Sequence, residues 1–205
     1  MKKRLKKLAK PLSILALIAF GLTAWSCTQG PRINEAPLPE GWPELTPVDE
    51  IQVKQYPVYR AAVIDEGTDA SQSGMFRPLF NHIKREDIAM TAPVEMTYNG
   101  DKQSSMAFLY RNPEMGTLGS DNEDGRVEVR EIEQQTAVSI GVRGSYSKEH
   151  FNEAVVKLNT WLDENKDQWQ ANGEPRFLGY NSPFVPWFMR YGEVQIPVEP
   201  TDDSE

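Results

Sequence analysis

Apolar residues along positions 51–198 recur with two periods, the period of strands and the period of helices. Alternation of apolar and polar residues, passing into an unbroken apolar run, predicts a strand over residues 51–64. Residues 88–98 and 105–110 have further strand signals, with a bend at Ala92-Pro93 because proline cannot donate to a sheet ladder. Between residues 64 and 88 lies a stripe at helical spacing, made of Met75, Phe76, Leu79, Phe80 and Ile83. Pro78 requires this helix to begin close to it or to bend there.

The second half of the chain repeats this order of elements. Strand signals cover residues 127–132 and 136–142, and later residues 176–180 and 193–198. Ser147 is a good N-cap for a second helix. The apolar stripe of that helix consists of Phe151, Ala154, Val155, Leu158, Trp161 and Leu162. The body therefore reads β-α-β-β twice, which predicts an α+β fold of duplicated units that form a distorted antiparallel β-barrel flanked by two helices.

Two short strings give the duplication its only direct sequence support. Residues 90–94 read Met-Thr-Ala-Pro-Val, and residues 180–184 read Tyr-Asn-Ser-Pro-Phe. We interpret them as repeat partners, each the hinge of one half-barrel. A duplicated fold of this kind leaves a groove between sheet and helices, which is a natural place for a ligand.

The first 27 residues have the layout of a secretory signal. Residues 1–26 hold six of the 22 basic residues and none of the 30 acidic ones, and an apolar run too short for a comfortable membrane span follows the basic cluster. Cys27 resembles the lipidation cysteine of bacterial lipoproteins, although Ala24 replaces their usual leucine. We expect an exported protein on the periplasmic side of the cell envelope, tethered to a membrane by a lipid anchor. Simple cleavage, or an uncleaved anchor, is the alternative.

Proline, charge and cysteine content define the remaining segments. Five prolines in residues 28–50 predict a semi-rigid spacer, and the acidic residues 199–205 predict a disordered tail. Residues 27–205 contain 16 basic and 30 acidic residues, a formal charge of −14, so we expect no nucleic-acid partner. One cysteine and two histidines, His82 and His150, offer no nitrogen and sulfur set for a metal site.

Four motifs together resemble the SOUL haem-binding protein family. They are Phe76-x-x-Leu79 through Ile83, Ile88-Ala-Met-Thr-Ala-Pro-Val94, Phe177-x-Gly179-Tyr180-x-x-Pro183 and Arg190-x-x-Glu193-Val194. The resemblance covers residues 51–198. It implies a distorted barrel related to the effector-binding domains of bacterial regulators, and it implies non-covalent binding of haem or another tetrapyrrole.

The resemblance also implies where the tetrapyrrole would lie, between the first helix and the loop before the last strand. The implied ligand-binding residues are Met75, Phe76, Leu79, Phe80, Ile83, Phe184, Val185, Trp187, Phe188 and Met189. Aromatic and methionine surface suits a flat apolar macrocycle. Arg77, Lys84 and Arg190 could pair with propionates at the rim. The alternative for the helix stripe is that it is simply core.

No strong iron ligand is evident in the sequence. Some family members have a histidine just before the first strand's tyrosine, and here Gln55 stands before Tyr56. His82, at the edge of the first helix's apolar face, is a candidate axial ligand, and Met75 and Met189 are others. We expect binding without a strong axial ligand, through apolar contact and propionate pairing.

Two other functions remain open. The same groove could bind a different small apolar ligand. An enzyme, such as a hydrolase, could use Glu95 and Glu193 as acid and base if both carboxyls pointed into the groove. We expect instead that Glu193 caps or pairs with Arg190, and that the protein is a binding protein and not an enzyme.

Overall fold

The computed structural model describes residues 36–65, 72–99 and 102–201. The predicted signal segment and Cys27 lie outside these residues, as do residues 28–35 of the expected spacer. Among the described helices, none combines the length and the apolar character needed to span a membrane.

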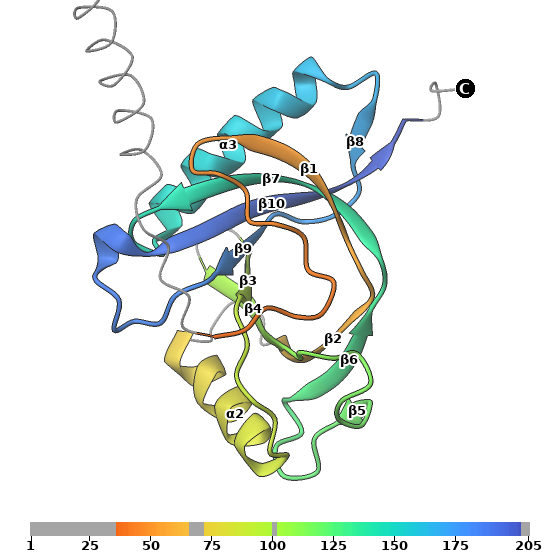
Figure 1. The fold of residues 1–205 in the computed structure, drawn as a ribbon, viewed down its shortest axis with the longest axis vertical. Coiled ribbons are helices and arrows are strands. Elements are labelled where there is room, and N and C mark those ends of the chain that lie inside the picture. Colours follow the sequence, from red (N-terminus) through yellow and green to blue (C-terminus); the bar gives the residue numbers. More distant parts are fainter. Residues whose placement is uncertain (1–35, 66–71, 100–101, 202–205) are drawn as a thin grey trace, which may run out of the picture. The chain divides into compact units, whose positions relative to one another are not determined.

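Two α-helices and one curled, open sheet make up the described fold (Figure 1). The helices are α2 (Gln72–Arg85) and α3 (Lys148–Glu164). The strands are β1 (Ile51–Tyr56), β2 (Tyr59–Asp65), β3 (Val94–Asn99), β4 (Lys102–Leu109), β5 (Gly119–Ser120), β6 (Glu128–Ile132), β7 (Gln135–Arg143), β8 (Trp169–Ala171), β9 (Arg176–Gly179) and β10 (Tyr191–Pro200). A single 3₁₀ turn, η2 (Trp187–Met189), precedes β10.

The sheet confirms the duplication. Its order is β1-β7-β10-β9-β3-β4-β2-β6-β5, so each half contributes three strands in a matching arrangement, β2-β4-β3 and β7-β10-β9. The two halves meet at the antiparallel pair β3 and β9. The first strand of each half also pairs with the other half: β1 pairs with β7, and β6 pairs with β2. This exchange follows a pseudo-two-fold axis between β3 and β9, and it adds a contact between the halves on each side of the β3–β9 pair that joins them.

The interpretation of the two proline strings as repeat partners is wrong. Residues 90–93 lie between α2 and β3, whereas residues 180–184 lie between β9 and β10. They occupy different places in the repeat, yet they are neighbours, because Val94 at the start of β3 pairs with Gly179 at the end of β9. The two strings therefore meet at one end of the central strand pair.

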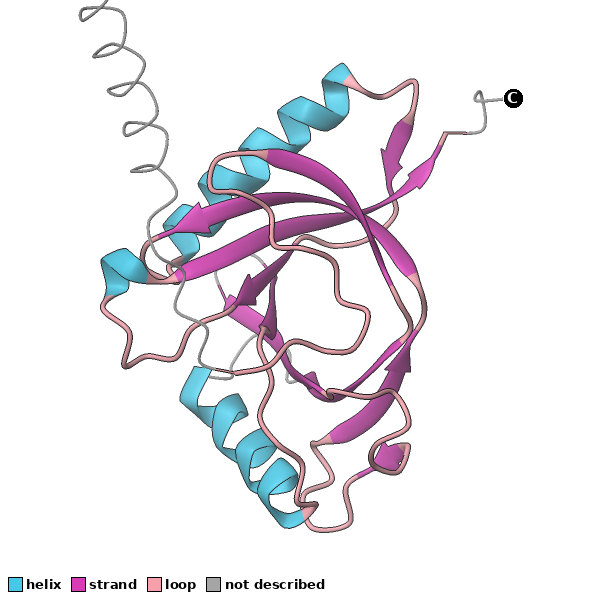
Figure 2. Cartoon of the chain, in the orientation of Figure 1, coloured by secondary structure: helices cyan, strands magenta, loops and turns pink. Residues whose placement is uncertain are grey.

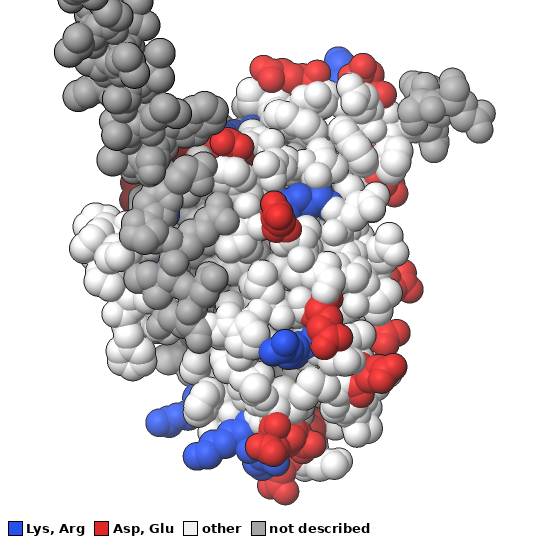
Figure 3. All heavy atoms as spheres, in the orientation of Figure 1, with Lys and Arg blue, Asp and Glu red and all other residues white. Residues whose placement is uncertain are grey.

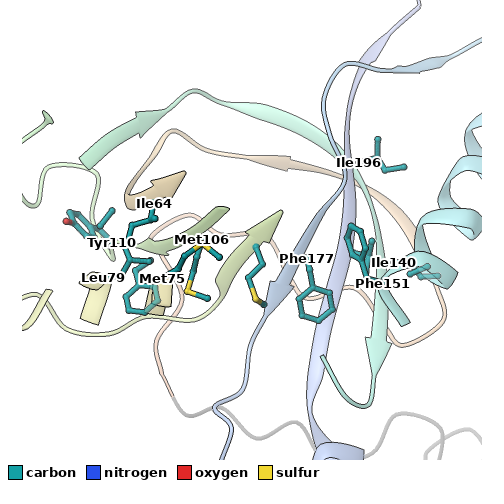
Figure 4. Close-up of a cluster of buried hydrophobic side chains, with 14 of the residues drawn as sticks. Ile64, Met75, Leu79, Met106, Tyr110, Ile140, Phe151, Phe177 and Ile196 are labelled. Carbon is teal, nitrogen blue, oxygen red and sulfur yellow. The ribbon is translucent and has the colours of Figure 1, made fainter. Parts of the chain in front are cut away.

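Both helices cover the same face of the sheet, which we call the helix face (Figure 2). Helix α2 packs on β4 and β2, and α3 packs on β10 and β7. The main core lies beneath them and runs from Leu79 and Met106 on the α2 side to Phe151 and Ile196 on the α3 side (Figure 4). Ser147 caps α3 as predicted, accepting a hydrogen bond from the backbone N–H of His150.

The opposite face of the sheet is covered by residues 36–50, which corrects part of the expected spacer. Trp42 is buried there and packs edge-on against Tyr56 and Tyr59. Thr46 is fully buried, and Asp49 donates its backbone N–H to the carbonyl of Gly141 at 2.8 Å. A Cβ at residue 141 would collide with backbone carbonyl oxygens of this segment. Residues 36–50 are thus part of the folded body.

Smaller departures have local causes. The strand expected over residues 51–64 divides into β1 and β2 because Pro57 interrupts the ladder. Helix α2 continues through Pro78. Strand β10 extends to Pro200, and Thr201 donates to backbone carbonyls of residues 167 and 168, so the tail is ordered to residue 201. The three residues of β8, which pair with β10, have too few positions to show a period.

Candidate functional site

A pocket of about 460 Å³ lies on the helix face, at the end of the central strand pair. Its volume falls in the range of small-molecule sites, roughly 300–1,000 Å³. The lining residues are Ala36, Pro37, Phe76, Phe80, Met90, Thr91, Ala92, Val94, Met96, Met106, Tyr146, Gly179, Tyr180, Asn181, Ser182, Pro183 and Arg190. All but one of these side chains are uncharged.

Helix α2 supplies an aromatic wall. Phe76 and Phe80 are one turn apart, and their rings stack with centroids 6.0 Å apart and planes 14° apart. They remain 37% and 45% exposed although they line the pocket. The edge-on contact of Phe76 with Phe108, at 5.0 Å, ties the wall to the sheet. Two such rings, partly open to solvent, are available to contact a flat apolar ligand.

The central strands supply the floor. Val94 and Met96 of β3 line the pocket because alternate side chains of a strand point to one face. Met106 lies opposite Met96 on β4 and lines the pocket as well. At Gly179 an added Cβ would come within 3.0 Å of the Tyr146 ring and 3.5 Å of the Met96 methyl. The missing side chain therefore lets the Tyr146 ring lie across β9.

The polar atoms of the floor are engaged within the protein. The Tyr146 hydroxyl donates to the Tyr191 carbonyl at 2.7 Å and accepts from the Asn181 backbone N–H at 2.8 Å. The Thr91 hydroxyl donates to the Leu109 carbonyl. The Tyr180 hydroxyl accepts from Trp42 Nε1 at 3.2 Å, and burial together with nearby Glu193 raises the pKa of the Tyr180 phenol well above its ordinary value. These groups hold the loops together and stay uncharged.

Arg190 provides the one cationic side chain of the lining. Its Nε donates to the Val185 carbonyl at 2.8 Å, one Nη donates to the Pro183 carbonyl at 2.7 Å, and the guanidinium lies over the Tyr146 ring. A guanidinium carries five N–H groups, so these two bonds leave others for an anion. The predicted ion pair between Arg190 and Glu193 is wrong, because the Glu193 side chain is buried on the opposite face of the sheet and pairs with Lys54.

The structure divides the residues implied by the resemblance. Of the helix stripe, Phe76 and Phe80 line the pocket, whereas Met75, Leu79 and Ile83 are buried in the core beneath. The loop residues do not line it: Val185 is buried, Met189 is partly buried, and Phe184, Trp187 and Phe188 are exposed. Arg77 and Lys84 are exposed on α2 outside the lining.

His82 is occupied within the protein. It is 4% exposed, its Nε2 lies 2.7 Å from the Tyr110 hydroxyl, and its Nδ1 contacts the carboxylate of Asp121. Burial opposes ionisation of Asp121, but hydrogen bonds from His82, from two backbone N–H groups and from Arg85 hold its pKa well below the ordinary value. An axial role would require the imidazole to give up one of these contacts.

The opposite face holds a sealed polar network centred on Glu193. This side chain is fully buried, and Lys54 Nζ lies 3.0 Å from its carboxylate. Further donors within hydrogen-bond distance are the Thr46 backbone N–H at 2.7 Å and the side chains of Tyr191, Gln195 and Ser139 at 2.9 to 3.1 Å. A buried carboxylate saturated in this way depends on its cation and donors, and it offers no free lone pair to a substrate.

Glu95 lies on that face too. It accepts from the Tyr59 hydroxyl at 3.1 Å and from Arg176 at 3.3 Å. In the sheet register Glu95 pairs with Leu178, which pairs with Glu193. Two strand spacings, about 10 Å, therefore separate the backbones of the two residues. Neither carboxylate lines the pocket. Among the described residues, no three His, Cys, Asp or Glu side chains gather as a metal site requires.

Only three of the 17 lining residues, Phe76, Phe80 and Arg190, were predicted as site residues from the sequence. Six of the lining residues that were missed come from four separate segments of the chain: Met90, Val94, Met96, Met106, Tyr146 and Gly179. Only the alternation of Val94 and Met96 could have been recognised in the sequence, and alternation alone does not show which face of the strand borders a ligand site.

Comparisons with known proteins agree with this fold. The profile of the family described as SOUL heme-binding protein matches residues 43–197. Among curated proteins, none matches the sequence significantly.

Solved structures are similar at low identity, so they inform the fold alone. The EcmrR chain of a cryo-electron microscopy EcmrR–DNA complex has a TM-score of 0.60 and 15% identity over 92% of this chain, which spans 65% of that one. The crystal structure of the EcmrR C-terminal domain has a TM-score of 0.55 and 16% identity, covering 74% of this chain and 98% of that one. A hydrolase from Listeria innocua has a TM-score of 0.55 and 13% identity, covering 75% and 94%.

Proposed function

The chain belongs to the SOUL heme-binding protein family, and we propose that its pocket binds haem or a related tetrapyrrole non-covalently, by contact with the macrocycle. The observation that carries this proposal is the lining itself. Stacked Phe76 and Phe80 form one wall, and the thioethers of Met90, Met96 and Met106 complete an uncharged surface. Aromatic rings and adaptable methionines suit a flat apolar ligand.

The residues fit the macrocycle better than they fit a histidine-ligated iron. No histidine lines the pocket, and both ring nitrogens of His82 are engaged by Asp121 and Tyr110. The soft atoms of the lining are the three methionine sulfurs, which are weak ligands compared with imidazole. The macrocycle therefore supplies most of the affinity, and the bound group is cargo that the protein buffers, carries or senses.

The anionic edge of such a ligand would lie at Arg190. Its guanidinium is at the lining and has N–H groups beyond the two that bind backbone carbonyls. Arg77 directly follows Phe76, and Lys84 is one turn beyond Phe80, so both cations extend the rim along the exposed side of α2. Propionates that reach past the pocket would meet these side chains.

The alternative roles receive less support. Acid and base catalysis by Glu95 and Glu193 would need both carboxylates in the pocket, and both lie on the opposite face of the sheet. Another flat apolar ligand would use the same contacts, and native mass spectrometry of protein purified from its own host would identify it. Export and lipid anchoring through Cys27 remain part of the proposal, supported by the sequence pattern alone.

Titration with hemin and with metal-free protoporphyrin IX tests the proposal. If the macrocycle is the recognised group, both give saturable changes of the Soret band with comparable Kd values. Binding of hemin alone would show that iron ligation dominates. No saturable change with either compound at micromolar protein would refute tetrapyrrole binding.

A further inference from the structure

The loop between β9 and β10 presents three aromatic side chains to solvent. Phe184, Trp187 and Phe188 are 95%, 61% and 57% exposed, which is unusual for three large rings within five residues. The Trp187 and Phe188 rings pack edge-on with centroids 5.8 Å apart. We call residues 181–189 the aromatic loop.

The aromatic loop is also uncharged. A quarter of all residues in the chain are charged, yet residues 177–189 contain no Lys, Arg, Asp or Glu. The surface at the left of Figure 3, where Figure 1 places this loop, is correspondingly free of charged atoms, while acidic groups gather on other parts of the same view. This separation distinguishes the loop from an ordinary solvated turn.

The loop is held in shape from beneath. Arg190 binds the carbonyls of Pro183 and Val185, and Arg143 donates to the Met189 carbonyl at 3.2 Å. The Val185 side chain is 5% exposed and anchors the loop to the body. The exposed rings are therefore presented outward by a braced backbone, and little conformational entropy remains to be lost when they bind.

The loop, the pocket and the N-terminal end of the described chain lie together. Ser182, Pro183 and Arg190 line the pocket, and so do Ala36 and Pro37 at the N-terminal end of the described chain. The Pro37 carbonyl accepts from the Ala92 backbone N–H at 3.0 Å, which fixes this end at the pocket. Eight residues lie between Cys27 and Ala36, and the nine Cα–Cα steps across them span at most about 30 Å. A lipid anchor at Cys27 would thus keep the pocket within about 30 Å of the bilayer.

We propose that the aromatic loop inserts into the headgroup region of the membrane to which the chain is tethered, and that this contact turns the pocket toward the bilayer. Trp and Phe side chains favour this region, where an apolar body meets water. The acidic body makes an electrostatic attachment to anionic lipid unfavourable, so the loop binds through its rings and suits a zwitterionic surface. The role of this orientation rests on the proposed function. An apolar tetrapyrrole partitions into membranes, and it would enter the pocket from there.

Fluorescence quenching by brominated lipid tests this contact in the full chain. The chain is reconstituted in phosphatidylcholine vesicles with and without brominated acyl chains. We expect bromolipid to quench the wild type, and Trp187→Phe to remove the part of the quenching that Trp187 contributes. Trp161→Phe on α3 is the matched control and leaves the quenching unchanged. Trp25 precedes Cys27, so cleavage of the signal segment removes it from the lipidated protein, and any uncleaved fraction carries it in every variant alike.

Equal quenching of wild type and Trp187→Phe would overturn the proposal. Sedimentation in the absence of vesicles gives a second test. A dimer that is lost in the double variant Phe184→Ser, Trp187→Ser would also overturn the proposal, because the rings would then form a protein interface. The porphyrin titration of the wild type separates the two proposals. Quenching through Trp187 without porphyrin binding would leave the membrane contact standing and refute the function, and the reverse result would refute the contact alone.

Discussion

The two faces of the sheet are built from the same strands and carry opposite chemistry. On the helix face, Val94 and Met96 form the floor of a pocket that is open at its aromatic wall and has Arg190 as the one charged side chain of its lining. On the other face, Glu95 and Glu193 belong to hydrogen-bonded networks, and Trp42 with the rest of residues 36–50 covers them. The pocket thus lies on the helix face, and the buried carboxylates lie on the other.

This difference shows that a carboxylate near a family motif need not be a catalytic group. Side chains on a strand alternate between faces, so Glu95 points away from the pocket that its neighbours Val94 and Met96 line. We call the face that carries Glu95 and Glu193 the network face. It should govern stability, and the helix face, which carries the pocket, should govern binding. Substitutions that affect one property without the other test that separation.

The largest effect is expected from Lys54→Met on the network face. The change leaves the fully buried Glu193 carboxylate without its cation, which costs about 3–5 kcal/mol in the free energy of unfolding. Urea unfolding measures the loss, and the porphyrin Kd of the folded variant should equal that of the wild type. Lys157→Met is the control, because its pair with Asp49 is exposed and contributes no more than about 1 kcal/mol. A weakened porphyrin Kd in Lys54→Met would contradict the separation of the faces.

His82→Ala should also change stability and not binding, although His82 belongs to the helix that forms the pocket wall. The substitution deprives the buried hydroxyl of Tyr110 and the carboxylate of Asp121 of a partner, at a cost of about 1–3 kcal/mol. Urea unfolding measures this loss in the free energy of unfolding. Loss of hemin binding with retained binding of metal-free protoporphyrin would instead identify His82 as an iron ligand.

Phe80→Ala should have the converse effect. The ring is 45% exposed, so its removal barely alters stability, but a bound macrocycle loses an aromatic contact worth about 1 kcal/mol, or roughly fivefold in Kd. Leu118→Ala, which truncates another exposed apolar side chain outside the pocket, should leave the Kd unchanged. Equal Kd values for Phe80→Ala and the wild type would exclude this wall from the binding site.

Arg190→Gln is expected to have the smallest effect. A partly exposed ion pair with a propionate contributes up to about 1 kcal/mol, so the Kd for protoporphyrin should rise roughly two- to fivefold. The dimethyl ester of the same porphyrin lacks the charge and is the matched control, and its Kd should not respond to the substitution. An equal loss for acid and ester would show that Arg190 acts by bracing the aromatic loop.

Elements with long periodic patterns could be predicted from the sequence. The stripe of α3 is an example, since Phe151, Ala154, Leu158 and Leu162 are buried as their spacing indicates. The duplicated order of elements also followed from pattern alone, and the sheet bears it out. The exchange of β1 and β6 between the halves could not be predicted, because strand pairing depends on contacts distant in sequence.

The segment that covers the network face gave a misleading signal. Residues 36–50 are rich in proline and have no period, which is typical of a spacer, yet Trp42 and Thr46 are buried. Their partners, Tyr180 and Glu193, lie more than a hundred residues away, so no local pattern could reveal the contact. Most of the pocket lining was unpredictable for the same reason, since its floor is assembled from segments that are distant in sequence and meet at the central strand pair.

Methionine methyl resonances offer the most direct test of the pocket as the tetrapyrrole site. Seven methionines occur in the chain, and Met90, Met96 and Met106 line the pocket while Met115 lies elsewhere. In ¹³C-methyl-labelled protein, metal-free protoporphyrin IX should shift the three pocket methyls through its ring current and leave Met115 unchanged. Shifts confined to Met189, in the aromatic loop, or no shift at saturating porphyrin, would contradict the account.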